Sequence, residues 1–207
     1  MTDRSVVGFI CRLKYEENIK KVYMMLNNDE KAERKQVLLE NCFELFTKQG
    51  LENTSINDLA SYCNTYKSSL YNFFESKDEI VLESAKMYMT KLNDMFFREF
   101  ISPKQTIEKT LTLCFEVVAK ERDGLRCIYQ IISSPAYGDE ARRELSAIYE
   151  RYEDYSSKIA QIYEIDFQCF KPWFLLYIAI IHDYCLWEDE ESTKEKLKFI
   201  CEQVSGL

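Results

Sequence analysis

The chain has 207 residues, of which 46% are hydrophobic and 30% are charged, a balance typical of a folded globular protein. Only 5 glycines and 3 prolines are present, so turn-rich β architectures are disfavoured and helices are expected. The net charge of −8 excludes a protein that is basic over its whole surface, although DNA binding requires only one suitable face.

Residues 1–30 are expected to form an N-terminal extension whose role the sequence leaves open. Its apolar residues are spaced loosely, as in a helix. In one hypothesis, translation starts at Met24 or Met25 and the upstream part is not made. In the alternative, the segment is an extra helix that packs on the body or contacts DNA outside the operator.

Residues 31–80 begin with the pattern of an amphipathic helix. Gly50 follows this helix. The residue directly after a helix often adopts the left-handed conformation, which glycine adopts easily. The apolar residues of the helix recur at steps of three and four: Leu38, Leu39, Cys42, Leu45 and Phe46.

Two short helices are expected next. Ser55 can cap the first of them at residues 56–62, and Asp58 three residues later completes a capping pattern. A brief turn at residues 64–66 then leads to a helix over 67–74. The three helices together predict a helix-turn-helix domain.

The remaining residues, 81–207, are expected to form a helical body. Gly124 is interpreted as a helix break, and Pro172 as the start of a helix. The sequence therefore predicts an all-α protein of about nine helices with no convincing strand. The helices expected from the fourth onward cover residues 77–100, 106–122, 125–132, 139–163, 171–187 and 193–204.

The cysteines and the single histidine do not predict a metal site or a cofactor. His182 has Asp183 beside it and Cys185 nearby, but adjacent positions share no helix face. The apolar run from Val6 to Cys11 is too short for a secretory signal, and no apolar run reaches a membrane span of about 18 residues. A cytoplasmic protein with no membrane partner and with reduced, mostly buried cysteines is expected.

The start of the expected helix at residues 67–74 has the chemistry of a DNA-reading helix. It carries hydroxyls, an amide, one lysine and a phenol, and no acidic residue lies between Lys67 and Phe74. A helix fits the major groove, where hydroxyls and lysines bind phosphates and base edges. Polar helix starts are also common in other proteins, so this pattern alone leaves DNA binding open.

The whole region resembles the DNA-binding domain of the tetracycline-repressor (TetR) family. The resemblance rests on the order and spacing of four pieces: LLENCFELF at 38–46 with Gly50, TSINDLA at 54–60, KSSLYNFF at 67–74 and SKDEI at 76–80. It implies core positions for Leu70, Phe74 and Ile80. It also implies phosphate or base contacts for these DNA-binding candidates: Thr54, Ser55, Thr65, Tyr66, Lys67, Ser68, Ser69, Tyr71, Asn72 and Lys77.

Three positions depart from the family pattern. Asn64 replaces the usual turn glycine, although asparagine tolerates the left-handed conformation. Tyr66 replaces a small capping residue, and Ser68 stands where glycine is common. Residues 31–80 also carry six Lys or Arg against eight Asp or Glu, a net charge of −2, which lowers the expected DNA affinity.

The body is expected to dimerise and to bind an effector. The segment 170–187 is apolar nearly all round, which favours burial against a second subunit, and the resemblance implies an interface built from the last two helices. The expected homodimer interface consists of Trp173, Phe174, Tyr177, Ile178, Ile181, Leu197, Ile200 and Val204. Aromatic residues that could line an effector pocket, or simply fill the core, are Phe115, Tyr129, Tyr152 and Phe174.

The expected function is that of a dimeric transcriptional repressor, released from a double-stranded DNA operator by an unidentified small molecule. The alternative is a small-molecule-binding or protein-interaction module with weakened or lost DNA recognition. An enzyme is disfavoured, since the sequence has no glycine-rich phosphate loop, no G-x-S-x-G motif and no cluster with metal-ligand spacing.

Overall fold

The computed structural model of the chain describes residues 29–100 and 105–207. Contacts divide the chain into two compact units, Met1–Leu39 and Glu40–Leu207. The two hypotheses for the N-terminal extension concern residues 1–28, which lie outside the described residues.

The N-terminal elements are three helices joined by tight connections. The first covers residues 29–49, α2 covers Ile56–Tyr62 and α3 covers Lys67–Leu70. Helix α3 is shorter than expected, because the backbone tightens after Leu70: the amide of Phe73 donates to the Leu70 carbonyl oxygen at 2.9 Å.

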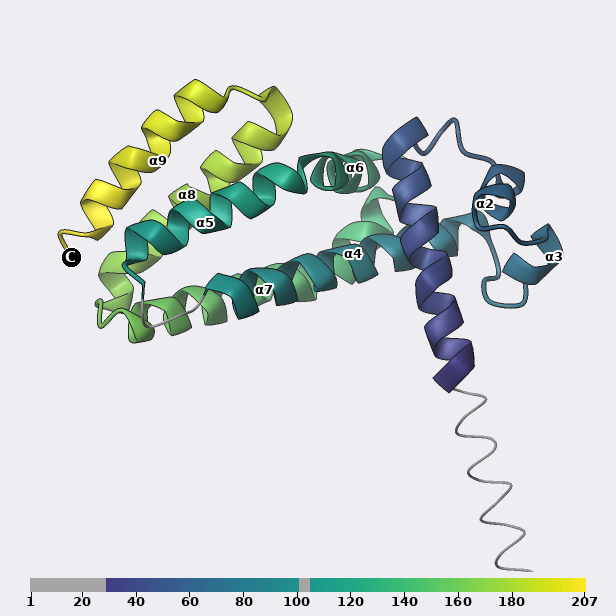
Figure 1. Cartoon of the computed structure of the whole chain (residues 1–207), viewed down its shortest axis with the longest axis horizontal. Coiled ribbons are helices and arrows are strands. Elements are labelled where there is room, and N and C mark those ends of the chain that lie inside the picture. The colour runs from purple at the N-terminus through teal and green to yellow at the C-terminus, as the bar shows by residue number, and fades with distance from the viewer. Residues whose placement is uncertain (1–28, 101–104) are drawn as a thin grey trace, which may run out of the picture. The chain divides into compact units, whose positions relative to one another are not determined.

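Six further helices form the body. The structure therefore contains nine helices and no strand over residues 29–100 and 105–207, as the sequence predicted. In chain order, the six helices are α4 (Lys77–Phe100), α5 (Ile107–Lys120), α6 (Arg122–Ser133), α7 (Gly138–Ile162), α8 (Phe167–Trp187) and α9 (Glu190–Val204) (Figure 1).

Helix α8 is the central element of the body. It packs against α5, α6, α7 and α9, and Figure 1 shows α8 and α9 as an antiparallel pair. Tyr177 of α8 is fully buried and donates its hydroxyl proton to the Leu111 carbonyl oxygen of α5 at 2.7 Å. Phe170 and Phe174 of α8 are buried with ring centroids 5.8 Å apart. These buried side chains account for the apolar inner face of α8.

Helix α8 also has the length and hydropathy of a membrane-crossing helix, although no uninterrupted apolar run of that length was found in the sequence. In the apolar stretch of 18 residues within α8, 39% of the residues are buried inside the protein. The core helix of a globular protein meets the same criterion, and the contacts of α8 with four other helices agree with that interpretation.

Several helix boundaries differ from the sequence-based expectation, and two of the differences involve a glycine or a proline. Gly124 lies inside α6 rather than ending a helix, since α6 already begins at Arg122. Pro172 lies inside α8, which begins at Phe167 because the Asp166 side chain accepts a hydrogen bond from the Cys169 amide at 3.0 Å. At Pro172, the capping hydrogen bond at the start of α8 outweighs a weak local propensity.

Candidate nucleic-acid interface

The start of α2 is fixed by a reciprocal capping box, as the sequence predicted. The Ser55 hydroxyl accepts from the Asp58 amide at 3.2 Å, and the Asp58 carboxylate accepts from the Ser55 amide at 2.8 Å. Hydrogen bonds from the Ser55 side chain and backbone lower the pKa of Asp58. The Ser55 side chain remains exposed at this helix start.

The turn between α2 and α3 is closed by a residue in the left-handed conformation. Asn64 has a φ of +49°, which confirms the expectation that asparagine can replace the turn glycine. The Asn64 amide donates to the Ser61 carbonyl oxygen at 3.1 Å, and the Thr65 amide donates to the Ala60 carbonyl oxygen at 2.9 Å. The turn is therefore held by backbone hydrogen bonds on both sides of Asn64.

Helix α3 is anchored by its last residue and presents its first residues to solvent. Leu70 is fully buried, whereas the side chain of Tyr66 is 81% exposed and makes no capping hydrogen bond. Lys67 and Ser68 are exposed as well. The Lys67 ammonium lies 5.9 Å from the centroid of the Tyr71 ring. The most polar part of this short helix is therefore also its most accessible part.

Most of the DNA-binding candidates lie at the surface. Thr65 and Ser69 are half-buried. The exposed candidates are Ser55, Tyr66, Lys67, Ser68, Tyr71 and Asn72. They belong to the start of α2 and to α3 with the turn that follows it.

Two other DNA-binding candidates are engaged inside the protein. Thr54 is 1% exposed, and its hydroxyl donates to the Gly50 carbonyl oxygen at 2.6 Å. The half-buried Lys77 donates from its ammonium to the Leu51 carbonyl oxygen at 2.8 Å. Both side chains stabilise the connection between the first helix and α2. Because their polar groups are engaged in these hydrogen bonds, this conformation does not present them to a phosphate.

The contact between the helix-turn-helix and the body is centred on Tyr88 of α4. Its ring stacks on Phe43 of the first helix, with centroids 4.3 Å apart and planes at 18°. Its hydroxyl donates to the Glu121 carbonyl oxygen at 3.0 Å, directly before α6. A side chain at Gly124 would overlap the Tyr88 ring, so the glycine allows α6 to approach α4 closely. Sequence reasoning missed this glycine because close approach leaves no local pattern.

The structure places most residues of the expected dimer interface inside the protomer. Trp173 and Ile178 are half-buried, and the other six are buried: Phe174, Tyr177, Ile181, Leu197, Ile200 and Val204. The residues predicted for the dimer interface therefore lie mostly on the inner side of the α8–α9 pair. Helical periodicity cannot distinguish an apolar face that packs inside the protomer from one that meets a second subunit.

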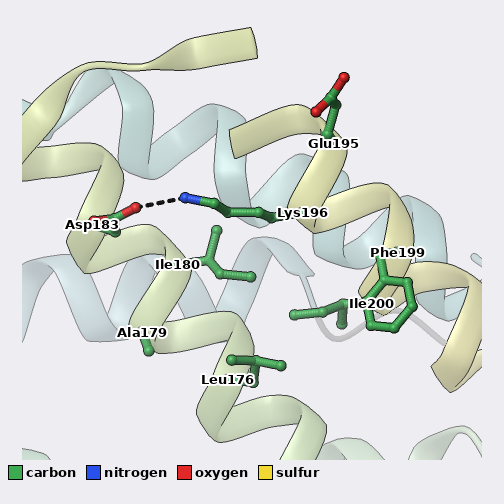
Figure 2. Close-up of a pocket in the computed structure, with 8 residues that line it drawn as sticks. All are labelled: Leu176, Ala179, Ile180, Asp183, Glu195, Lys196, Phe199 and Ile200. Carbon is green, nitrogen blue, oxygen red and sulfur yellow. Dashed lines mark hydrogen bonds and ion pairs between the residues drawn. The ribbon is translucent and has the colours of Figure 1, made fainter. Parts of the chain in front are cut away.

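The outer side of the same helix pair is apolar and exposed. It presents Leu175, Leu176 and Phe199, whose exposed fractions are 52%, 43% and 53%. A groove of about 580 Å³ lies on this side. Figure 2 shows its lining side chains and the ion pair between Lys196 and Asp183, whose charged atoms are 2.8 Å apart. The groove is lined by Leu176, Ala179, Ile180, Asp183, Glu195, Lys196, Phe199 and Ile200. We call this side the outer α8–α9 face.

The aromatic candidates for an effector pocket are distributed over the core. Phe115 is buried and meets Tyr184 edge-on at 5.0 Å, and Phe174 is buried beside Phe170. Tyr129 is half-buried with its ring 5.5 Å from His182, and Tyr152 is half-buried on α7. Burial lowers the pKa of His182. Over the part of the chain that the structure describes, no three His, Cys, Asp or Glu side chains gather as a metal site.

The sequence matches known regulators over the helix-turn-helix. Residues 38–84 match the family described as "Bacterial regulatory proteins, tetR family". The uncharacterized HTH-type transcriptional regulator YuxN of Bacillus subtilis is 26% identical over 94 residues, which are 44% of this chain and only 32% of YuxN. The biofilm operon icaADBC HTH-type negative transcriptional regulator IcaR of Staphylococcus aureus (strain Newman) is 25% identical over 131 residues, which are 63% of this chain and 69% of IcaR.

Solved structures with this fold include further regulators. A TerR/AcrR-family transcriptional regulator from Aquifex aeolicus VF5 aligns with a TM-score of 0.59 and 18% identity, over 83% of this chain and 98% of that one. The multidrug binding protein EbrR, solved in complex with malachite green, aligns with a TM-score of 0.59 and 12% identity over the same shares. The capped α2, the exposed start of α3 and these matches show that residues 38–84 form a helix-turn-helix similar to that of tetR-family regulatory proteins, within a chain whose fold resembles theirs.

Proposed function

We propose that the protein is a dimeric repressor that binds a near-palindromic operator through α3 and is released from it by a small molecule. The observation that carries this proposal is the exposed polar start of α3, where Tyr66, Lys67 and Ser68 stand out on a helix anchored by the buried Leu70. Side chains placed in this way can reach base edges and phosphates in a major groove. Binding of chromosomal DNA places the protein in the cytoplasm.

Within this proposal, the contacts come from the accessible candidates alone. Ser55 at the start of α2 and Tyr71 after α3 bind phosphates, while Tyr66 and Lys67 at the start of α3 face base edges and the phosphate backbone. Thr54 and Lys77 support the loop between the first helix and α2 through their hydrogen bonds to Gly50 and Leu51. The acidic residues Glu52, Asp58 and Glu75 are exposed nearby and limit the electrostatic attraction to DNA.

The dimer forms in this proposal through the outer α8–α9 face. Exposed leucines and phenylalanine on neighbouring helices favour burial against an apolar partner surface. A second copy of the same helix pair offers such a surface, and two copies related by a twofold axis form a four-helix interface. A dimer also matches the twofold symmetry of a palindromic site.

For an effector to release the protein from DNA, a change in the body must reach α3. The stack of Tyr88 on Phe43 and the Tyr88–Glu121 hydrogen bond connect α6 to the first helix through one side chain of α4. A ligand that shifts α6 would change the position of the first helix. It would thereby shift the equilibrium between two arrangements of the helix-turn-helix domains. EbrR, whose fold is similar, was solved with malachite green, so an aromatic ligand is a suitable first probe.

The test is a fluorescence anisotropy titration of the purified full chain against duplex DNA from upstream of its own gene. We expect saturable binding that weakens steeply with salt, because phosphate contacts release counterions. A scrambled duplex of equal length and composition is the control. If neither the upstream DNA nor any duplex selected from a random library binds better than the scrambled duplex, the alternative of a module without DNA recognition replaces the proposal.

A further inference from the structure

Two cysteines from distant parts of the sequence meet beside the helix-turn-helix. Cys42 lies in the first helix and Cys63 is the C-cap of α2, and their Sγ atoms are 3.8 Å apart. Cys42 is fully buried, whereas Cys63 is half-buried and borders solvent. The pair therefore combines one thiol that a small oxidant can reach with a second thiol directly behind it.

A second contact fixes the same two elements at this place. The Lys48 ammonium of the first helix donates to the Tyr62 hydroxyl oxygen of α2 at 2.7 Å and pairs with Glu44 at 2.6 Å. Tyr62 directly precedes Cys63 in the chain. The approach of the two sulfur atoms is thus part of a packed helix contact and does not depend on a single rotatable side chain.

The two thiols differ in acidity. The hydrogen bond between them raises the pKa of Cys42, and burial raises it further. The same hydrogen bond lowers the pKa of Cys63. Cys63 consequently ionises first, and a thiolate is the form that reacts with peroxides.

We propose that Cys42 and Cys63 form a reversible disulfide on exposure to a hydroperoxide, and that this disulfide weakens DNA binding. The first step is attack of the Cys63 thiolate on one peroxide oxygen, which gives a sulfenic acid and hydroxide. The Cys42 sulfur then attacks the Cys63 sulfur, the S–O bond breaks and water leaves with the Cys42 proton. Overall, two thiols and hydrogen peroxide give one disulfide and two waters, and two electrons pass from sulfur to the peroxide bond.

The consequence for DNA follows from the position of Cys63. A disulfide has an S–S distance of about 2.0 Å, so the two sulfur atoms must approach by about 1.8 Å. Cys63 is followed directly by Asn64, which closes the turn, and three residues later by Tyr66, which caps α3. Drawing Cys63 toward the first helix therefore moves the turn that positions the exposed start of α3.

This inference rests on the proposed function for its DNA effect, and the disulfide itself can be tested without DNA. Trypsin cleaves after Lys35, Lys48 and Lys67, so residues 36–48 and 49–67 become separate peptides with one cysteine each. The reduced full chain is treated with hydrogen peroxide, alkylated and digested without reductant. We expect a cross-linked pair of these two peptides, two hydrogen masses lighter than their sum, that disappears after treatment with dithiothreitol.

The DNA arm uses anisotropy with the upstream duplex before oxidation, after oxidation and after re-reduction. We expect affinity to fall at least about fivefold on oxidation and to recover fully, a loss comparable to that of one good base contact. Cys63→Ala and Cys42→Ala should each bind equally well before and after peroxide, and circular dichroism checks their helical fold. Cys169→Ala, which removes an exposed thiol of α8, should respond like the parent chain.

The outcomes separate the two proposals. Peptides that carry unlinked thiols or separate sulfinic acids after peroxide overturn the disulfide, whatever the DNA result. A disulfide with less than about a fivefold loss of affinity overturns its effect on DNA binding. Reduced protein that fails to bind any duplex argues against the proposed function, while the peptide map still decides whether the two cysteines pair.

Discussion

At the scale of single residues, the accessible lysine of α3 carries the clearest prediction. Lys67 is exposed and lies near the Tyr71 ring, on a surface segment that contains no acidic residue before Glu75. A lysine at this place acts as a point charge for phosphate, whereas the neighbouring hydroxyls supply hydrogen bonds. Its removal should therefore weaken DNA binding without changing which sequence is preferred.

In a dimer that carries the substitution in both subunits, Lys67→Ala should lower affinity for the upstream duplex by about 2 kcal/mol and make the slope of log K against log salt shallower by about 1.8, twice the effect of one phosphate contact. Anisotropy titrations at several salt concentrations measure both quantities. Lys120→Ala, which removes an exposed lysine at the end of α5, is the matched control and should change neither. Equal effects of the two substitutions would show that Lys67 contributes only to net charge.

The single histidine carries a second prediction at this scale. Because burial lowers the pKa of His182, the folded state binds its proton less readily than the unfolded state. The contribution of neutral His182 to the free energy of unfolding is therefore fully present above the ordinary histidine pKa of about 6.5. It is lost as the pH falls from there through the pKa of His182 in the folded state. Thermal melts between about pH 8 and pH 5 should show this loss, since 6.5 lies inside that window.

His182→Gln should remove the histidine-dependent part of that slope, because glutamine does not titrate. The comparison is the difference in melting temperature between the two ends of the pH range, measured for both proteins. An identical pH dependence of the parent chain and the variant would mean that other groups, such as the carboxylates, account for the whole loss.

At the scale of elements, the contact between α4 and α6 depends on the absence of a side chain. Gly124 is the third residue of α6, and glycine inside a helix is intrinsically unfavourable by about 1 kcal/mol relative to alanine. The Tyr88 ring occupies the space that a methyl group would need. Packing thus overrides helix propensity, and the usual gain from a glycine-to-alanine change in a helix should be reversed.

Gly124→Ala should lower the free energy of unfolding by about 1–3 kcal/mol, the range for overpacking in a close-packed interior. Urea denaturation followed by circular dichroism measures this change. Gly206→Ala is the control, because a methyl group there meets only ordinary van der Waals contacts. A Gly124→Ala protein as stable as the parent would show that α6 can move away from Tyr88 at no cost.

At the scale of the whole molecule, the proposed dimer depends on the outer α8–α9 face. Phe199 and Leu176 line an open groove beside the Lys196–Asp183 ion pair, and Leu175 extends the apolar surface. A charged side chain at the centre of such a face would be buried without a partner in a dimer, which is strongly unfavourable.

Phe199→Glu should therefore convert a dimer of twice 24.6 kDa into a monomer at micromolar concentration, as measured by light scattering. The helical content should remain, because the Phe199 side chain is largely exposed in the protomer. Ser157→Glu places the same charge on an exposed position of α7 and should leave the dimer intact. A parent chain that is already monomeric would contradict the dimer proposal itself.

The sequence by itself determined the local features of the helix-turn-helix. The Ser55–Asp58 capping box and the left-handed residue at Gly50 follow from short-range patterns. The left-handed Asn64 and the buried Leu70 and Phe74 were expected from the resemblance to the TetR family. Capping and turn conformation depend on side chains only a few residues apart, so they can be predicted from spacing.

Only the tertiary structure decided which helix faces meet and which candidates are accessible. It placed Thr54 and Lys77 in internal hydrogen bonds, buried Phe174, Tyr177 and Ile181 of the predicted interface inside the protomer, and brought the Sγ atoms of Cys42 and Cys63 within 3.8 Å of each other. The role of Gly124 could also not be predicted from the sequence, because it depends on the position of the Tyr88 ring in another helix. These features arise from contacts between residues far apart in the chain, and helical periodicity records the burial of a face but not its partner.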